Sequence, residues 1–108
     1  MSDGPDGVRV EDVPDRGQFQ ARIGDEIVGY LAYRRRPGRI ALIHTEVDPA
    51  FEGRGVGSAL ARSALDAARS DGLRVRVGCP FVTVWLRRHR EYDDVVDRAV
   101  TTGAAAGG

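Results

Sequence analysis

The sequence predicts one domain of the α+β (mixed α/β) class, with a mostly antiparallel sheet and about two helices. Three observations support this prediction. Apolar and polar residues alternate up to residue 47, as they do in half-buried strands. After residue 55 the apolar residues recur with a helical period, and a strand pattern and a second helical pattern follow. The length of 108 residues suits a single domain, so strands followed by a mixed segment fit this fold class.

The folded domain is expected at residues 8–100. Residues 1–7 are rich in Gly, Asp and Pro, and residues 101–108 are all small. Segments of this kind cannot bury enough apolar surface to become ordered, so both ends are expected to be disordered.

Antiparallel strands are expected to fill the first half. The turns between them are predicted at Gly24 and at Pro37-Gly38, because Gly and Pro favour turn conformations. Gly29 interrupts the second strand and indicates a bulge. The expected strands are residues 19–23, 27–33 and 39–47, with residues 8–10 as an edge strand. The three arginines Arg34, Arg35 and Arg36 are placed in the second turn, either solvated or bound to an acidic partner.

The second half combines helix and strand. A helix is expected from Gly55 or Gly57 to the Asp71-Gly72 pair, where Gly suits the end of a helix. A strand follows at residues 73–77 and a second helix at residues 81–89. The buried stripe of the first helix is expected to hold Val56, Leu60, Ala64, Ala67 and Ala68, opposite Arg62, Asp66 and Arg69; that of the second is expected to hold Val82, Trp85 and Leu86.

Composition excludes several classes of function. The 16 basic residues balance the 16 acidic ones, so no overall field attracts nucleic acid or a membrane surface. All basic residues are Arg, which excludes a lysine Schiff base and a P-loop lysine. No metal site is expected, because Cys79 is the one cysteine and His44 and His89 are the only imidazoles. A single cysteine and the lack of a signal region or membrane-length apolar run favour a cytoplasmic protein.

Three alternating glycines, Gly53, Gly55 and Gly57, stand between the third strand and the first helix. Glycine lets the backbone approach a ligand closely, and the first amides of a helix bind anions. The segment therefore predicts a phosphate site, the alternative being a tight turn with a helix cap. The lack of Lys excludes a P-loop, and Ser58 stands where a dinucleotide fold requires the third glycine.

This turn resembles the pyrophosphate loop of the GNAT superfamily of N-acetyltransferases, whose motif is Gln/Arg-x-x-Gly-x-Gly/Ala. Glu52 departs from the first position of the motif. The segments Ile43-His44-Thr45-Glu46-Val47 and Gly78-Cys79-Pro80-Phe81-Val82 resemble a minimal subgroup with HTEV and CPY-type segments, with Phe81 in place of the usual Tyr. The resemblance covers residues 19–96, which is most of the domain.

The resemblance implies a central sheet that splays open at a cleft for CoA. It implies an acyl-CoA-dependent N-acyltransferase that uses acetyl-CoA as co-substrate and an unidentified amine, small molecule or protein, as acceptor. The alternative is a non-catalytic CoA-binding module or sensor. The backbone of Val47 is expected to pair with the pantetheine amides, and the turn is expected to hold the pyrophosphate through Gly53, Arg54, Gly55, Val56, Gly57 and Ser58.

Two candidate bases precede the turn. Strict alternation places Ile40, Leu42, His44 and Glu46 on one face of the third strand. His44 and Glu46 are then neighbours near the expected thioester, where a base must deprotonate the amine. The alternatives are a core imidazole for His44 and a solvated sheet face for Glu46.

Cys79 follows a strand directly, and Pro80 favours an extended backbone at this residue. Its thiol is therefore expected to enter the cleft, where it would either accept the acyl group or protonate the leaving thiolate. The alternative is a small buried side chain. One of Arg87, Arg88 and Arg90 either contacts the CoA phosphates or is solvated.

The chain is short for this family. Residues 11–18 leave no room for the extra helices that shape an acceptor site in longer members, and little of the chain remains after Tyr92. The acceptor half is therefore expected to be reduced, which fits a large acceptor on an open face or no acceptor at all. A monomer is favoured.

Overall fold

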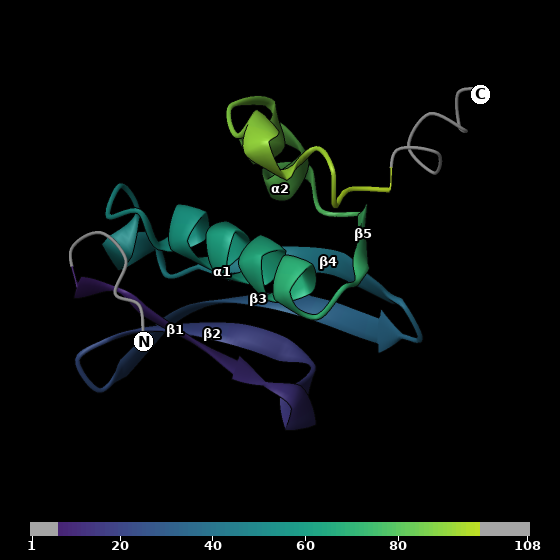
Figure 1. The fold of residues 1–108 in the computed structure, drawn as a ribbon. Coiled ribbons are helices and arrows are strands. Elements are labelled where there is room, and N and C mark those ends of the chain that lie inside the picture. Colours follow the sequence, from purple (N-terminus) through teal and green to yellow (C-terminus); the bar gives the residue numbers. More distant parts are fainter. Residues whose placement is uncertain (1–6, 98–108) are drawn as a thin grey trace.

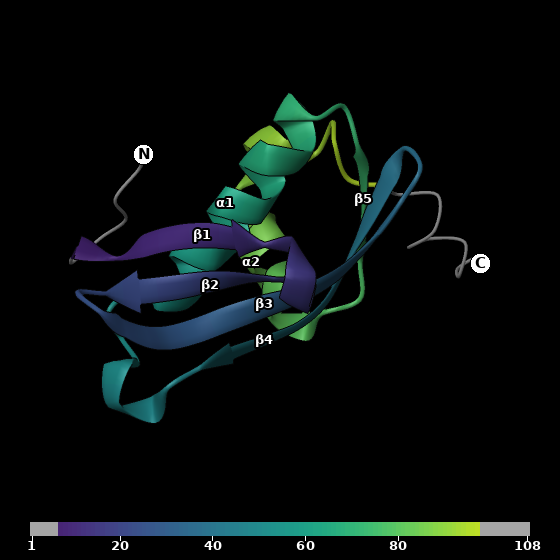
Figure 2. The same cartoon turned by 90° about the horizontal axis from the view of Figure 1, so that it is seen from below.

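A five-stranded sheet forms the base of the molecule, and both α-helices lie on the same side of it (Figures 1 and 2). The computed structural model describes residues 7–97. The strands are β1 (Arg9–Val13), β2 (Gln18–Ile23), β3 (Glu26–Arg36), β4 (Arg39–Val47) and β5 (Arg74–Val77), and the helices are α1 (Val56–Ser70) and α2 (Pro80–Arg87). Short 3-10 turns occupy Pro14–Arg16, Pro49–Phe51 and Arg90–Tyr92.

The sheet has the strand order β1-β2-β3-β4-β5. Neighbours among the first four strands are antiparallel, and β5 is parallel to β4. The predicted α+β class with a mostly antiparallel sheet and two helices is therefore confirmed. Neither helix is long and apolar enough to cross a membrane within residues 7–97.

Three predicted boundaries need correction. The three arginines lie in β3, where Arg34 pairs with Ala41 and Arg35 with Ile40, so the turn is only Pro37-Gly38. The edge strand runs to Val13 instead of ending at residue 10. The second helix ends at Arg87 because the next amides bond three residues back, which tightens the last turn.

The core lies between α1, α2 and the sheet. The predicted stripe on α1 is buried except for the partly exposed Ala67, and Arg62, Asp66 and Arg69 point outward as predicted. Each fully buried Leu contributes about 1.5–3 kcal/mol through the apolar surface it removes from water. The largest side chains that are no more than 1% exposed are Leu31, Leu42, Leu60, Leu65, Ile40, Val8, Val28, Val56, Val75 and Val82.

Gly29 brings β3 and α1 close together. A Cβ at this residue would lie 2.8 Å from the carbonyl oxygen of Glu46 and 3.0 Å from the Val56 side chain. The expected bulge is present but sits one residue earlier, since Ala21 pairs with Gly29 and the register shifts there, which leaves Val28 as the extra residue.

The sheet splays open between β4 and β5. The two strands pair only from Arg39↔Arg74 to Leu42↔Val77, and the Gly78 amide adds a last bond to the Leu42 carbonyl at 2.8 Å. The remaining part of β4, Ile43 to Val47, has no partner on this side among the described residues. A free strand edge therefore faces the gap.

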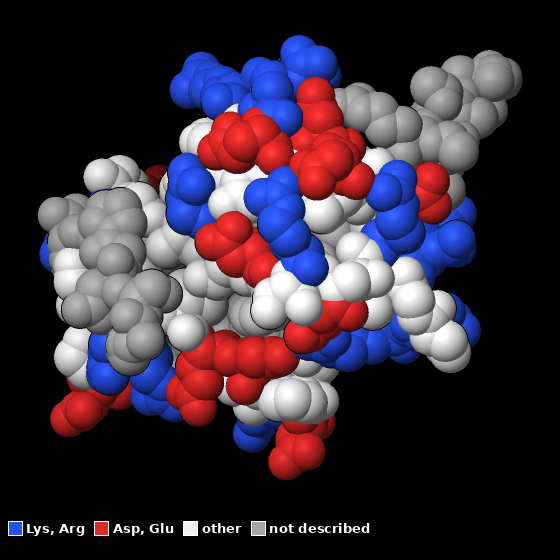
Figure 3. All heavy atoms as spheres, in the orientation of Figure 1, with Lys and Arg blue, Asp and Glu red and all other residues white. Residues whose placement is uncertain are grey.

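Charged side chains of both signs alternate over the visible face of the helices (Figure 3). Several of them are paired: Arg35 contacts Asp12 at 3.0 Å and Asp71 at 3.5 Å. These contacts join the end of β3 to β1 and to the end of α1, so the charge of Arg35 is paired within the molecule.

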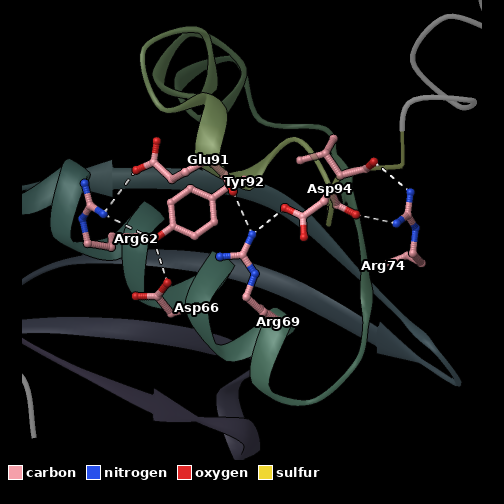
Figure 4. Close-up of polar contacts among 8 residues, drawn as sticks. Arg62, Asp66, Arg69, Arg74, Glu91, Tyr92 and Asp94 are labelled. Carbon is pink, nitrogen blue, oxygen red and sulfur yellow. Dashed lines mark hydrogen bonds and ion pairs between the residues drawn. The ribbon is translucent and has the colours of Figure 1, made fainter.

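The segment after α2 crosses the outer face of α1 and is anchored by polar contacts (Figure 4). The Tyr92 hydroxyl donates to Asp66 at 2.6 Å, and Arg69 pairs with Asp94. Val96 then forms a parallel bridge with Val75 on the free side of β5. This segment extends the sheet beyond what the sequence pattern predicts.

Candidate active site

The glycine turn connects β4 to α1 through two left-handed residues. Gly53 has φ +83° and Gly55 has φ +81°, a conformation that residues other than Gly rarely adopt. The turn begins where the Asp48 carboxylate accepts the Ala50 amide at 2.9 Å. The turn ends at Gly55, and α1 starts at the next residue, Val56.

The first turn of α1 presents amides without acceptors inside the helix. Ala59 makes the first i→i−4 bond, to the Gly55 carbonyl at 3.0 Å. The amides of Val56, Gly57 and Ser58 precede it and therefore have no intrahelical acceptor. Together with the positive end of the helix dipole, they suit a bound phosphate.

A hollow of about 570 Å³ links this turn to the free edge of β4. Its wall at β4 includes Thr45 and Glu46, whose side chains point to opposite faces of the strand. The hollow therefore touches the backbone edge of the strand. The lining residues are Thr45, Glu46, Val47, Phe51, Glu52, Gly53, Gly55, Val56, Gly57, Ser58 and Phe81.

The absence of a side chain at Gly57 leaves room for the Phe81 ring. A Cβ at this residue would lie 2.7 Å from the tip of the Phe81 ring. Phe81 belongs to the first turn of α2 and is 42% exposed. Its ring therefore packs directly on the start of α1 and forms one side of the hollow.

His44 and Glu46 form a close pair on the open face of the sheet. The His44 Nε2 and Glu46 Oε1 atoms are 2.7 Å apart, and the two side chains are 55% and 60% exposed. The predicted neighbour relation is present. The alternative of a core imidazole is wrong for His44, since so exposed a ring is not part of the core.

The predicted sharing of one face with Ile40 and Leu42 is wrong. Leu42 pairs with Tyr33 and His44 with Ala32, so Ile43 is an extra residue that forms a bulge. A bulge shifts the alternation by one residue. Ile40 and Leu42 therefore face the core, while His44 and Glu46 face away from it.

Cys79 lies behind the wall of the hollow. Its side chain is 2% exposed, and its Sγ atom lies 3.1 Å from the Thr45 hydroxyl, which does line the hollow. The backbone at Cys79 is extended, as Pro80 predicts. Thr45 is thus a site residue that sequence reasoning missed, although it belongs to the HTEV segment.

The structure gathers only part of the predicted site around the hollow. Glu46, Val47 and the turn from Gly53 to Ser58 line it, apart from Arg54. The Arg54 guanidinium lies over the Phe51 ring at 5.8 Å. His44 lies on the open face and Cys79 on the core side, so the three catalytic candidates do not form one cluster.

A second residue missed as part of the site is Trp85, which the sequence places in the core. It is 6% exposed, and its indole nitrogen donates to the Ser58 hydroxyl at 2.8 Å. The helical spacing that predicts burial for Trp85 does not identify the partner of its polar atom.

Comparison with known proteins identifies the family. The family described as GCN5-related N-acetyl-transferase matches residues 18–95, which is most of the chain. The chain belongs to this family. The GNAT resemblance drawn from the sequence is therefore confirmed, and the chain is an acyltransferase of the N-acetyltransferase class.

Relatives of this GNAT protein match over most of their length. Protein NATD1 of Bos taurus is 36% identical over 84 residues, which cover 76% of this chain and 74% of that protein. The human NATD1 is 33% identical over 84 residues with the same coverage, 76% and 74%. The solution structure of a GCN5-like protein from Staphylococcus aureus superposes with a TM-score of 0.64 and 26% identity, covering 82% of this chain and 87% of that one.

Proposed function

We propose that this GNAT protein transfers the acetyl group of acetyl-CoA to an amine. The observation that carries the proposal is the hollow that joins the glycine turn to the free edge of β4. CoA combines a diphosphate with an extended arm that contains two amide groups. The amides of the turn suit the diphosphate, and an unpaired strand edge suits the arm.

In this proposal the diphosphate binds the amides at the start of α1, and the pantetheine arm pairs with the backbone near Val47. The thioester then lies toward Thr45, at the other end of the hollow. The amine approaches from the open face of the sheet, which carries His44 and Glu46. This arrangement separates the co-substrate side from the acceptor side.

The transfer requires a neutral amine and a proton for the leaving group. A new C–N bond forms as the C–S bond breaks, the thiolate of CoA leaves, and the amine gives up one proton. The exposed His44–Glu46 pair is the base that we propose for this proton, directly or through water. The proton that the thiolate takes up comes from solvent or from the Thr45–Cys79 pair.

The burial of Cys79 favours direct transfer over an acyl-enzyme. A thiol that is 2% exposed and screened by Thr45 does not present its sulfur to the hollow. Intact mass spectrometry after incubation with acetyl-CoA tests this. Direct transfer predicts no adduct, whereas a gain of about 42 Da, one acetyl group, on Cys79 would establish the covalent route.

Binding and turnover separate this proposal from its alternative. Acetyl-CoA should bind the wild-type chain, and Gly53→Ala or Gly55→Ala should weaken binding, because each imposes a side chain at positive φ in the turn. Gly38→Ala is a matched control, since Gly38 has φ +74° but lies in the hairpin between β3 and β4, outside the hollow. An equal loss of acetyl-CoA affinity in all three variants would mean that the turn does not bind the co-substrate.

The alternative is a CoA-binding module or sensor without turnover. It is favoured by the open sheet face, where no helix among the described residues covers β1 to β4 opposite α1 (Figure 2). An amine panel of polyamines, peptides and whole proteins decides between them. Acetylated product that is lost in His44→Ala supports the enzyme, whereas tight binding without any product supports the sensor. Failure to bind any CoA species would exclude both.

A further inference from the structure

The chain has one tryptophan, and its polar atom points at the proposed phosphate site. Trp85 lies on α2, yet its indole nitrogen donates to the hydroxyl oxygen of Ser58 on α1 at 2.8 Å. Ser58 is in the first turn of α1 and lines the hollow. A core residue of one helix is thereby connected to the wall of the ligand site on another.

The direction of this hydrogen bond determines what Ser58 can do. An indole N–H only donates, so the Ser58 oxygen is the acceptor. A serine hydroxyl has a single proton, and this contact does not use it. The oxygen is held from the α2 side, and its proton remains available for an acceptor in the hollow. Accepting one hydrogen bond also makes a hydroxyl a better donor in the next.

Neighbouring rings hold the indole in place. The His89 ring stacks on Trp85 with a centroid distance of 3.8 Å and an angle of 9°. The His89 Nδ1 atom also lies 2.8 Å from the Trp85 carbonyl oxygen. On the α1 side the Arg62 guanidinium lies 5.4 Å from the indole centroid. The donor therefore has a fixed position relative to α1.

We propose that Trp85 is a positioning residue of the CoA site, holding the Ser58 hydroxyl so that it donates to the diphosphate. The proposal rests on the proposed function, since it assumes that the diphosphate of CoA binds at the start of α1. In this proposal α2 contributes to co-substrate binding in addition to the amides of the turn. A diphosphate oxygen is a charged acceptor, so the contact is stronger than one to a neutral group.

The test is a double-mutant cycle on CoA affinity with Trp85→Phe, Ser58→Ala and the double variant. Ser58→Ala should raise the Kd for CoA about tenfold, and Trp85→Phe about threefold. In the Ser58→Ala background Trp85→Phe should change nothing, because its effect passes through the hydroxyl. In turnover, Trp85→Phe should raise KM for acetyl-CoA and leave kcat unchanged.

Two controls distinguish positioning from simple packing. Pantetheine lacks the diphosphate, so its affinity should be the same for wild type and Trp85→Phe. Val82→Ala removes another buried side chain of α2 that has no polar contact with Ser58, and it should leave CoA affinity unchanged. Additive losses in the cycle, or an equal loss of pantetheine affinity in Trp85→Phe, would overturn the proposal.

A fluorescence measurement avoids the risk that Trp85→Phe does not fold. Because Trp85 is the only tryptophan, its emission in the wild type reports on its own hydrogen bond. Saturating CoA should shift this emission, and the shift should be smaller in Ser58→Ala. An unchanged emission in a CoA-saturated wild type would overturn the positioning role alone. Absence of CoA binding would instead overturn the proposed function on which it rests.

Discussion

Gly29 and Gly57 both lie too close to a neighbour to carry a side chain, yet the neighbours differ. Gly29 faces a backbone carbonyl at 2.8 Å from an ideal Cβ, whereas Gly57 faces the tip of an exposed aromatic ring at 2.7 Å. A backbone atom in a paired strand cannot move without disrupting the sheet. An exposed Phe81 ring can move at little cost, so the two glycines should respond differently to the same substitution.

Gly29→Ala should destabilise the fold. The added methyl group meets the Glu46 carbonyl and the Val56 side chain, and overpacking of this kind costs about 1–3 kcal/mol. Urea unfolding followed by circular dichroism gives the free energy of unfolding. A variant as stable as wild type would show that β3 and β4 can separate without loss.

Gly57→Ala should weaken CoA binding without loss of stability. Replacing a helical Gly with Ala adds about 1 kcal/mol of helix preference, which offsets the cost of moving Phe81. The displaced ring narrows the hollow, so the Kd for CoA should rise. The double variant Gly57→Ala/Phe81→Ala should recover affinity, and a double variant that binds as poorly as Gly57→Ala would contradict this explanation.

Sequence reasoning identified the turn glycines better than the residues around them. Gly53 and Gly55 are recognisable because positive φ has a sequence signature, and the structure places both in that conformation. Ile43 has no such signature, since a bulge at an apolar residue leaves the alternation pattern unmarked. The face of His44 was therefore not predictable from period alone.

The segment from Arg90 to Asp97 is held across α1 by hydrogen bonds that ionisation of Tyr92 would disturb. Burial, together with the hydrogen bond to Asp66 and the charge of that carboxylate, raises the pKa of Tyr92 above its ordinary value of 10.0. Burial and the bond to Asp12 likewise raise the pKa of Tyr33 above 10.0. Both phenols thus stay protonated in the folded chain at a pH where the unfolded chain loses these protons.

Stability should therefore fall as the pH rises above 10. A raised pKa contributes stability that is complete below the unfolded value of 10.0 and is lost as pH passes through the folded pKa. The chain contains no Lys, so tyrosines dominate titration in this range. Urea unfolding at pH 8 and pH 11 measures the loss of free energy of unfolding between these two pH values. Tyr92→Phe and Tyr33→Phe should each reduce it, and an unchanged loss in both variants would contradict the assignment.

At neutral pH, Tyr92→Phe should cost about 1–3 kcal/mol, the usual size of two hydrogen bonds. The ring still packs against Trp85 and Arg69, so only the contacts of the hydroxyl to Asp66 and Arg62 are lost. For comparison, Asp93→Asn removes the charge that pairs with Arg90 in the same segment, and such a surface ion pair should contribute less, about 0–1 kcal/mol. A cost near zero for Tyr92→Phe would mean that packing alone anchors the segment.

Helices were predictable and the C-terminal connection was not. The apolar stripes of α1 and α2 repeat with the helical period, which marks their buried faces directly. The segment from Val95 to Asp97 is too short to show a repeating pattern of apolar residues. Its pairing with Val75 depends on the direction in which the chain leaves α2. Long-range pairing of so short a piece has no local signal.

The whole molecule is small, and ligand binding should change its stability strongly. A ligand present at 100 times its Kd stabilises the folded state by about 2.7 kcal/mol. For a domain of this size each kcal/mol raises Tm by about 4–8 °C, so CoA should raise Tm by roughly 10 °C or more. Differential scanning fluorimetry with CoA measures this, with pantetheine as the weaker comparison. No shift at millimolar CoA would exclude a CoA site.

The splay between β4 and β5 leaves β5 joined to the rest of the sheet by a short stretch of pairing. Only four residue pairs and one further amide connect the two strands, whereas α2 and the segment after it are also held to α1 by the Trp85–Ser58 and Tyr92–Asp66 hydrogen bonds. We therefore expect the amides between β4 and β5 to open at a lower free energy than those between β2 and β3, and native-state hydrogen exchange would measure this difference. A ligand bound in the hollow would contact both β4 and the start of α1, so CoA should slow amide exchange at both.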